Sequence, residues 1–137
     1  FLEEIEDIFV AAKDYLRNLK ARGIQKDHIL QSSTLMLLDK NNMTRQYIDD
    51  YLQENQIIIK DSIDISDMDL LIDFARIGVG VACVIKNFVR EDLENGTLVE
   101  IPLGFPIHKR EVGFAYKTTT KPSKSLAEFI HFYKTYR

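Results

Sequence analysis

The chain alternates short apolar runs with segments that carry one apolar face. Ile5 to Ala12 is apolar between acidic flanks, and Thr34 to Leu38 is a continuous apolar run too short for a typical helix. Between them, Asp14 to Arg22 repeats apolar residues at helical spacing and ends at Gly23. A short continuous apolar run is typical of a strand buried on both faces of a parallel sheet. The pattern predicts a strand, a helix and, after a loop that ends near Ser33, a buried strand.

Two further helices are predicted from their apolar faces. The first is amphipathic, because apolar residues recur three and four positions apart while polar residues face away. Its apolar stripe consists of Met43, Tyr47, Ile48, Tyr51 and Leu52. The second begins at Ser66, where Asp69 completes an S-x-x-D capping signature, and it ends at Gly78. This helix is apolar around most of its surface, so we expect it to be covered on more than one side.

The remaining pattern predicts four strands and two helices. They are a strand at Ile57 to Ile65, a strand at Gly80 to Ile85, a short helix at Asn87 to Leu93, an edge strand at Leu98 to Ile101, a one-sided strand at Lys109 to Lys117 and a final helix after Pro122. Strands and helices alternate, which predicts an α/β fold with a mainly parallel sheet flanked by helices. The 137 residues are the size of one domain.

Charge and composition narrow the function classes. A formal net charge of −3 lacks the excess of Lys and Arg that binding to a nucleic-acid backbone usually needs, so this segment is not expected to contact DNA. No apolar run approaches the length of a membrane span. Cys83 is the single cysteine, which excludes a disulfide within the chain and favours the cytoplasm. Phe1 stands where an initiator methionine would, which indicates a piece of a longer protein.

The predicted topology points to a binding rim. In an open α/β sheet, ligands bind beyond the carboxyl ends of the strands, where loops lead into helix N-termini. Three such junctions are expected, at Asp39 to Thr44, Ile65 to Met68 and Val84 to Asn87. Each would present unpaired backbone N–H groups and the positive end of a helix dipole to the same rim. Such a rim suits a small polar or anionic ligand.

Individual side chains at this rim have more than one interpretation. Asn42 is expected to cap its helix, whereas the hydroxyl of Thr44 is open to a ligand. Arg45 places a cation in a first helical turn, against the dipole, which indicates either a functional site or an ion pair with Asp49. Both readings stay open. Ser66 is expected to cap its helix first and to contact a ligand second.

Other groups of residues do not indicate a metal, nucleotide or catalytic site. The acidic cluster Asp61, Asp64, Asp67 and Asp69 lacks the glycine and glutamate of a calcium loop. Gly78-Val79-Gly80 lies after a helix and before a strand, the reverse of a nucleotide-binding loop, and Cys83 lies in an apolar strand as a packing residue. The three histidines lack metal-ligand spacing. We therefore expect no catalytic residue, no metal and no cofactor, and the chain is not predicted to be an enzyme.

Three stretches together resemble a known family. They are T-L-M-L-L-D, then N-N-M-T-R-Q-Y-I-D-D-Y-L, then I-S-D-M-D-L-L-I-D-F-A-R-I-G-V-G-V-A-C-V-I, and the later K-R-E-V-G-F-A-Y fits as well. This order resembles the effector-binding (regulatory) domain of LysR-type transcriptional regulators. The resemblance spans nearly the whole chain, and its most specific part runs from Ser66 to Ile85.

The resemblance implies a place for this chain within a larger regulator. In that family the regulatory domain has two lobes of the periplasmic-binding-protein type 2 fold, joined by crossing strands, with the effector bound between them. Ile5 to Ala12 would be the outgoing crossover strand, Val112 to Lys117 the returning one, and residues 13–108 the second lobe, followed by a C-terminal helix. The first lobe and the DNA-binding domain would lie outside this chain. The intact protein would be a homodimer or homotetramer that contacts DNA only through that other domain.

The resemblance also implies effector contacts. By position they fall at Asn41, Asn42, Thr44, Ser66, Asp67, Met68, Val84 and Ile85, and Arg45 joins them for an anionic effector. These are the junctions that the strand-end argument selects. The family commonly has proline where this chain has Ile85, so the wall of the pocket is expected to differ there. The effector is expected to be a small polar or anionic metabolite.

Three alternatives remain open at this stage. A solute-binding protein of a transport system shares the fold but requires a signal peptide or lipid anchor upstream. An enzyme built on the same lobe requires a catalytic group on the rim. The isolated chain could also associate with itself through the apolar stripe of its last predicted helix, which consists of Leu126, Phe129, Ile130 and Tyr133.

Overall fold

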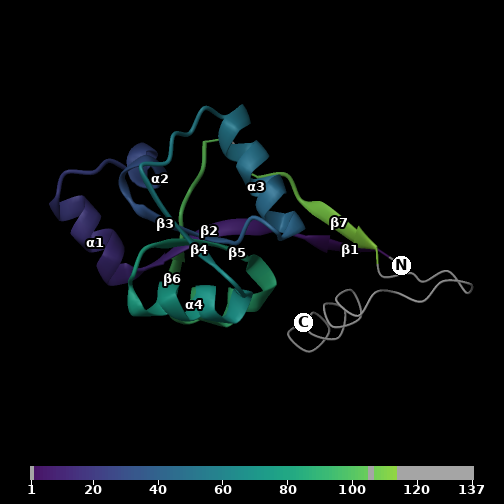
Figure 1. The fold of residues 1–137 in the computed structure, drawn as a ribbon. Coiled ribbons are helices and arrows are strands. Elements are labelled where there is room, and N and C mark those ends of the chain that lie inside the picture. Colours follow the sequence, from purple (N-terminus) through teal and green to yellow (C-terminus); the bar gives the residue numbers. More distant parts are fainter. Residues whose placement is uncertain (1, 105–106, 114–137) are drawn as a thin grey trace, which may run out of the picture.

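The computed structural model describes residues 2–104 and 107–113. The elements follow one another in an alternating order that Figure 1 shows. They are β1 (Leu2–Ile5), β2 (Asp7–Ala12), α1 (Lys13–Ala21), η1 (Lys26–His28), α2 (Ile29–Ser32), β3 (Thr34–Leu38), α3 (Met43–Glu54), β4 (Asp61–Ile65), α4 (Met68–Ile77), β5 (Val81–Ile85), η2 (Lys86–Val89), α5 (Arg90–Asn95), β6 (Leu98–Glu100) and β7 (Arg110–Gly113).

A five-stranded mixed sheet forms the centre of the lobe. Its strand order is β4-β3-β5-β2-β6. β3 pairs in parallel with both β4 and β5, whereas β2 runs antiparallel to its neighbours β5 and β6. Four of the five strands therefore run in one direction, as the alternation predicted, and β2 is the exception. A separate two-stranded ribbon of β1 and β7 extends from one side of the lobe (Figure 1).

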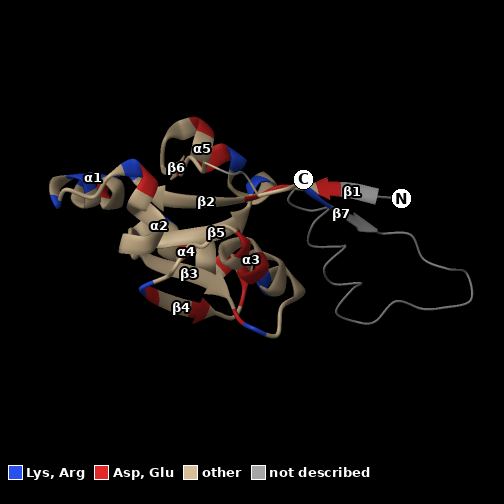
Figure 2. Ribbon diagram, turned by 90° about the horizontal axis from the view of Figure 1, so that it is seen from above, with Lys and Arg blue, Asp and Glu red and all other residues tan. Residues whose placement is uncertain are grey.

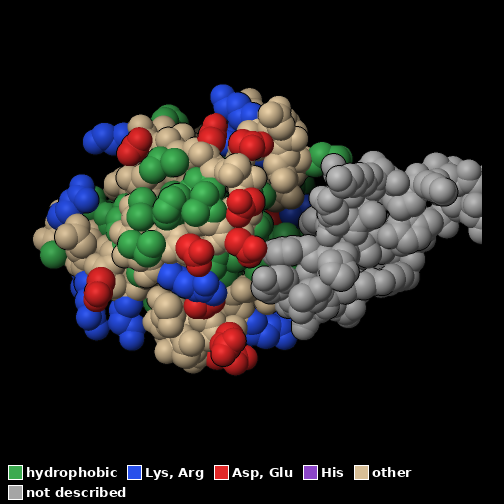
Figure 3. Space-filling view, turned by 60° about the horizontal axis from the view of Figure 1, so that its bottom comes forward, with side chains coloured by type: hydrophobic (Ala, Val, Ile, Leu, Met, Phe, Trp, Pro, Cys, Tyr) green, Lys and Arg blue, Asp and Glu red, His purple; other side chains and the backbone are tan. Residues whose placement is uncertain are grey.

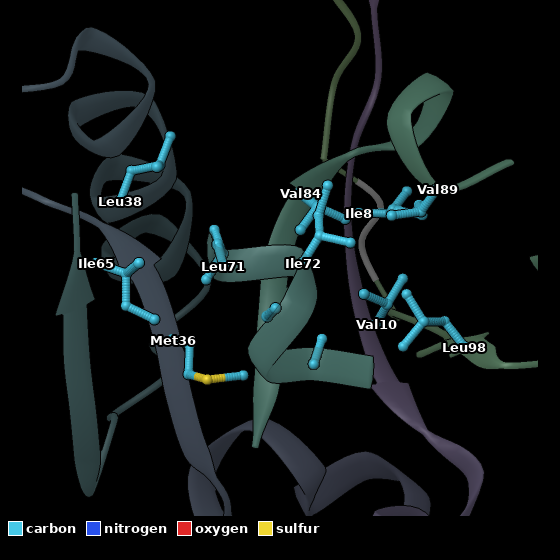
Figure 4. Packing of buried hydrophobic residues seen from close by; sticks show 12 residues of the cluster. Ile8, Val10, Met36, Leu38, Ile65, Leu71, Ile72, Val84, Val89 and Leu98 are labelled. Carbon is cyan, nitrogen blue, oxygen red and sulfur yellow. The ribbon is translucent and has the colours of Figure 1, made fainter. Parts of the chain in front are cut away.

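Two apolar clusters sandwich the sheet, because successive side chains of a strand point to opposite faces. In β3, Met36 and Leu38 belong to the cluster under α4, and Leu35 and Leu37 to the cluster under α3. Figure 4 shows the first cluster, with Leu71 and Ile72 of α4 lying against the sheet. Burial of each such aliphatic side chain stabilises the fold by about 1.5–3 kcal/mol. The continuous apolar run of β3 is thus explained by helices on both faces.

Charged residues are concentrated outside the inner strands of the sheet. Figure 2 shows the inner strands β2, β3 and β5 almost free of charge, with acidic and basic residues around them. The β1–β7 ribbon and the helices carry most of the colour in that view. None of the helices within residues 2–104 and 107–113 has the length and apolarity needed to cross a membrane.

The strand predicted at Ile57 to Ile65 is too long. Only Asp61–Ile65 is a strand, and it forms an edge of the sheet with four of its five residues exposed. Ile57 and Ile59 instead pack against the cluster under α3, while Ile58 is 80% exposed. The segment does alternate between buried and exposed residues, but the alternation comes from packing against this cluster and not from pairing in the sheet.

The start of α4 also differs from the prediction. Asp67 is the N-cap, and its carboxylate accepts a hydrogen bond of 2.8 Å from the backbone N–H of Leu70. Ser66 is exposed and precedes the cap, so the S-x-x-D signature was assigned one residue too early. Carboxylate and hydroxyl are both good caps, and the end of β4 at Ile65 decides which of them takes the position. The predicted end at Gly78 is confirmed, with φ at +94°.

The second apolar side of α4 remains uncovered in the described structure. Leu70 is 39% exposed and Ile77 is 74% exposed, which contradicts the expectation that neighbours cover the helix on more than one side. Figure 3 shows hydrophobic side chains gathered on this face of the molecule, among acidic and basic ones.

Other differences are smaller. The predicted first strand is interrupted at Glu6, and the predicted loop before Ser33 contains η1 and α2. The final helix after Pro122 and residues 114–117 of the returning strand lie outside the described residues.

Gly80 lies where no side chain fits. A Cβ added there would be 2.3 Å from the backbone carbonyl oxygen of Thr34 on the neighbouring strand. We expect Gly80→Ala to lower the free energy of unfolding by about 1–3 kcal/mol, because β3 and β5 would have to separate. Urea unfolding followed by circular dichroism measures this. Gly104→Ala is the matched control, because a Cβ at Gly104 meets nothing within 4 Å; equal losses in both variants would contradict the packing argument.

Candidate functional site

The three predicted junctions lie at one edge of the sheet. Leu38 pairs with Ile65 at the ends of β3 and β4, and the N–H of Asp39 donates to the carbonyl of Ile65 over 3.1 Å. Because β3 and β5 are also parallel in register, β5 ends at the same edge with Ile85. We call this edge the rim: residues 39–45, 66–68 and 84–87. The expectation that the three junctions meet at one edge of the sheet is therefore confirmed.

At the first junction the Asn side chains organise the start of α3. Asn42 is the N-cap, as predicted, and its side-chain oxygen accepts a hydrogen bond of 2.8 Å from the N–H of Thr44. The N–H of Asn41 donates to the carboxylate of Asp39 over 3.1 Å. These local hydrogen bonds fix the loop, and Asn41 itself is exposed. Both residues therefore shape the rim, and Asn42 does so through a capping bond that it already makes.

Arg45 is held within the chain. Its side chain is 8% exposed, its Nε donates to Asp49 over 2.8 Å, and its Nη1 donates to Asp64 over 2.6 Å and to the carbonyl of Leu38 over 2.9 Å. Burial by itself lowers the pKa of Arg45, but the hydrogen bonds and charges of the two carboxylates outweigh it, so the pKa is raised. Of the two readings, the ion pair with Asp49 is present, and the guanidinium also fastens α3 to β3 and β4.

The second and third junctions present mainly backbone. Ser66 and Asp67 are exposed, and Met68 is half-buried against the cluster under α4. Val84 and Ile85 are buried at 1% and 3% exposure, and the side chain of Val84 belongs to that cluster. A ligand at the third junction would therefore meet backbone more than side chain. One donor there is already engaged, since the N–H of Lys86 donates to the carbonyl of Glu6 over 2.9 Å.

The structure adds a buried ion pair that the sequence argument missed. Asp7 lies at the same edge because β2 runs antiparallel and pairs Asp7 with Ile85. Arg110 binds Asp7 with two hydrogen bonds, from Nε over 2.6 Å and from Nη2 over 2.9 Å. Nη2 also donates to the hydroxyl oxygen of Thr44 over 3.2 Å. The open hydroxyl of the sequence prediction thus has one partner in the chain.

Burial and charge explain the state of this pair. The side chain of Asp7 is 1% exposed and that of Arg110 is 19% exposed. Burial lowers the pKa of Arg110, but the hydrogen bond and the charge of Asp7 outweigh it and the pKa is raised. The sequence did offer one signal for this pair: Asp7 adjoins an apolar run that predicts a buried strand, and a buried carboxylate requires a partner. The partner lies 103 positions away and could not be found by spacing.

Among the described residues, Thr44 borders only a small open pit. A pit of about 10 Å³ lies there, lined by Leu37, Leu38, Thr44, Arg45, Ile48 and Cys83. That volume holds about one water at most, whereas metabolite sites have roughly 300–1,000 Å³. Cys83 is buried, and its burial raises the pKa of the thiol well above the ordinary value, which agrees with the predicted packing role.

A larger groove lies between α4 and η2 and does not involve the rim residues. It has a volume of about 320 Å³ and is lined by Asp69, Ile72, Asp73, Arg76 and Phe88. Its cation is paired, since Arg76 binds Asp92 with bonds of 2.9 and 3.0 Å and Asp73 with one of 3.1 Å. Within the described residues, no three His, Cys, Asp or Glu side chains gather as they would around a metal ion.

A comparison with known protein families identifies the lobe. The family model of the LysR substrate binding domain matches residues 3–137. The chain belongs to this family. No curated protein sequence matches it. The mixed sheet with helices on both faces is accordingly the LysR lobe of the periplasmic-binding-protein-like fold.

Solved structures of LysR regulators share the fold. The apo regulatory domain of HypT from Salmonella typhimurium is 18% identical, with a TM-score of 0.62 over 98% of this chain. The regulatory domain of CcmR from Synechocystis PCC6803, in complex with 2-PG, is 12% identical, with a TM-score of 0.65 over 96%. The chain spans 64% of each of these two structures. At these identities the likeness concerns the fold alone.

Arg45 should contribute to the stability of the LysR lobe. We expect Arg45→Met to lower the free energy of unfolding by about 1–3 kcal/mol, because the carbonyl of Leu38 loses its buried donor. Denaturant unfolding measures the change.

Arg17→Met is the matched control for this substitution, since the Arg17 side chain is 71% exposed and pairs with the exposed Asp14. Its expected change is within about 0.5 kcal/mol. If Arg45→Met were as mild as the control, the fastening of α3 to β3 by Arg45 would be disproved.

Proposed function

We propose that this chain is the effector-sensing second lobe of a LysR-type transcriptional regulator, and that a small polar metabolite binds between its rim and a first lobe. The observation that carries the proposal is the meeting of three strand-to-helix junctions at one edge, in a chain of the LysR substrate-binding family. Because the lobe has a wall and no metabolite-sized pocket at Thr44, the site requires a second wall.

The contacts that we propose are mostly uncharged. The hydroxyls of Thr44 and Ser66 and the backbone groups of residues 66–68 and 84–85 would face the effector, with Asn41 and Asn42 shaping the loop. Arg45 is paired with two carboxylates, so its part is to hold α3 in place. The positive ends of α3 and α4 still favour a carboxylate or another oxygen acceptor of the effector.

The ligands of two structural neighbours agree with a small polar effector. The regulatory domain of CcmR was solved in complex with 2-PG, and the effector-binding domain of QuiR in complex with shikimate. QuiR is 14% identical to this chain, with a TM-score of 0.61. We take from them only the class of ligand, a compact polar metabolite.

The remaining parts of the proposal concern the intact regulator. The first lobe and the DNA-binding domain would lie outside this chain, which covers 44% of full-length HypT. The regulator would act in the cytoplasm as a homodimer or homotetramer, without catalysis, and would pass effector occupancy to its DNA-binding domains. A typical coupling of this kind amounts to about 1–3 kcal/mol.

Thr44 offers the sharpest test of the site. In the intact regulator, with an effector found by thermal-shift screening of polar metabolites that include shikimate and 2-PG, we expect Thr44→Val to weaken the response by roughly 5-fold or more, because a hydrogen bond to the effector is lost. Thr44→Ser keeps the hydroxyl and should retain the response. A transcriptional reporter titrated with the effector measures both variants.

Ser66 is tested in the same assay with a control from the neighbouring strand. Ser66→Ala should weaken the response to the effector, whereas Ser62→Ala, in exposed β4 and away from the rim, should not. A full response in both Thr44→Val and Ser66→Ala would remove the proposed site.

A further inference from the structure

A buried ion pair lies where the β1–β7 ribbon meets the lobe. Asp7 is the first residue of β2, and Arg110 is the first residue of β7. Their double hydrogen bond closes the junction where the β1–β7 ribbon meets the sheet. The ribbon extends away from the lobe beyond this point (Figure 1). Any change in the angle between ribbon and lobe therefore acts on the surroundings of Arg110.

The guanidinium of Arg110 also contacts the first two turns of α3. Nη2 of Arg110 donates to Thr44 Oγ1, and the guanidinium carbon lies 5.4 Å from the ring centroid of Tyr47. The hydroxyl of Tyr47 donates to the carbonyl of His108 over 2.6 Å. The helix that carries the rim residue Thr44 thus holds the returning segment at residues 108 and 110 by three separate contacts.

The contacts of Arg110 differ in how readily they can be broken. The Asp7–Arg110 pair is buried and bidentate, and breaking it would leave a buried carboxylate without a partner, which is strongly unfavourable. The bond from Arg110 to Thr44 is longer, at 3.2 Å, and its acceptor is a neutral hydroxyl that solvent or a ligand can also engage. The ion pair is the permanent part of the cluster, and the Thr44 bond is the part that a ligand can alter.

We propose that Arg110 couples the occupancy of the rim to the position of the crossover ribbon. An effector that engages the Thr44 hydroxyl changes the support of Arg110 from α3, and Arg110 passes this change to β2 through Asp7 and to β7 through its own backbone. By linkage, a ribbon position that strains the Arg110–Thr44 bond changes effector affinity to the same extent. The inference rests on the proposed function, because it takes Thr44 as an effector contact.

Spin-label distances test the coupling in the intact regulator without the effector. Labels on cysteines introduced at Glu4 in β1 and Asn18 in α1, both exposed, report the position of the ribbon relative to the far end of the lobe. Cys83 is buried with a raised thiol pKa and does not compete for the label. Cysteines elsewhere in the regulator are replaced by serine.

Four variants are compared with the labelled parent. We expect Arg110→Lys to broaden and shift the distance distribution. A lysine ammonium cannot form both hydrogen bonds to Asp7 and also reach Thr44. Thr44→Val and Tyr47→Phe should each shift it less, whereas Thr44→Ser should match the parent. The Thr44 and Tyr47 variants leave the buried charges paired, so the test survives even if Arg110→Lys unfolds, which circular dichroism would reveal.

The outcomes separate the coupling from the proposed function. A parental distribution in Thr44→Val and Tyr47→Phe overturns the coupling, whatever Arg110→Lys does. If Thr44→Val loses the effector response but keeps the parental distribution, the effector site stands and the coupling fails. If Thr44→Val shifts the distribution but keeps the full response, the effector site at Thr44 fails, and the coupling of occupancy to the ribbon fails with it.

Discussion

The parallel register of β3 with β4 and β5 is the constraint on which the rest of this structure depends. It ends three strands at one level, where Leu38, Ile65 and Ile85 lead into the loops of the rim. Tight backbone packing maintains this arrangement, because Gly80 leaves no room for a Cβ beside the carbonyl of Thr34. The register needs apolar side chains on both faces of β3, and the two clusters supply them. The position of the rim is therefore a consequence of the core.

The charges near the rim are arranged to support structure first. Arg45 is neutralised by Asp49 and Asp64, and Arg110 by Asp7. What remains for an effector are hydroxyls, backbone groups and the positive ends of two helices. The proposed half-site would select its effector by hydrogen-bond geometry more than by net charge, because neither guanidinium can leave its carboxylate partners without a large desolvation cost. This is consistent with a lobe that forms one wall and depends on a second wall for closure.

The buried pair at the base of the ribbon gives the lobe a defined mechanical connection. Two strands that leave a sheet side by side could move freely about their last hydrogen bonds. Here Asp7 and Arg110 cross-link them, and Thr44 and Tyr47 of α3 support the cross-link from the side. Arg110 of the ribbon therefore contacts Thr44 of the rim directly. Thr44 is thus both a proposed effector contact and a hydrogen-bond partner of Arg110 at the junction.

Much of this protein was determined by the sequence alone. The periodicity specified β3, α3 and β5, because strands buried on two faces and amphipathic helices have distinct patterns, and Asn42 and Gly78 marked their helix ends through local hydrogen bonding and a positive φ. Tertiary structure decided what local pattern leaves undetermined. It shortened the strand at Ile57 to Ile65, since Ile57 and Ile59 pack against the core cluster under α3. It also made Asp67, and not Ser66, the cap because β4 ends at Ile65. It further paired Arg45 with Asp64 in addition to Asp49 and brought Arg110 to Asp7. Ion pairs between distant residues depend on which strands meet, and no spacing along the chain encodes that.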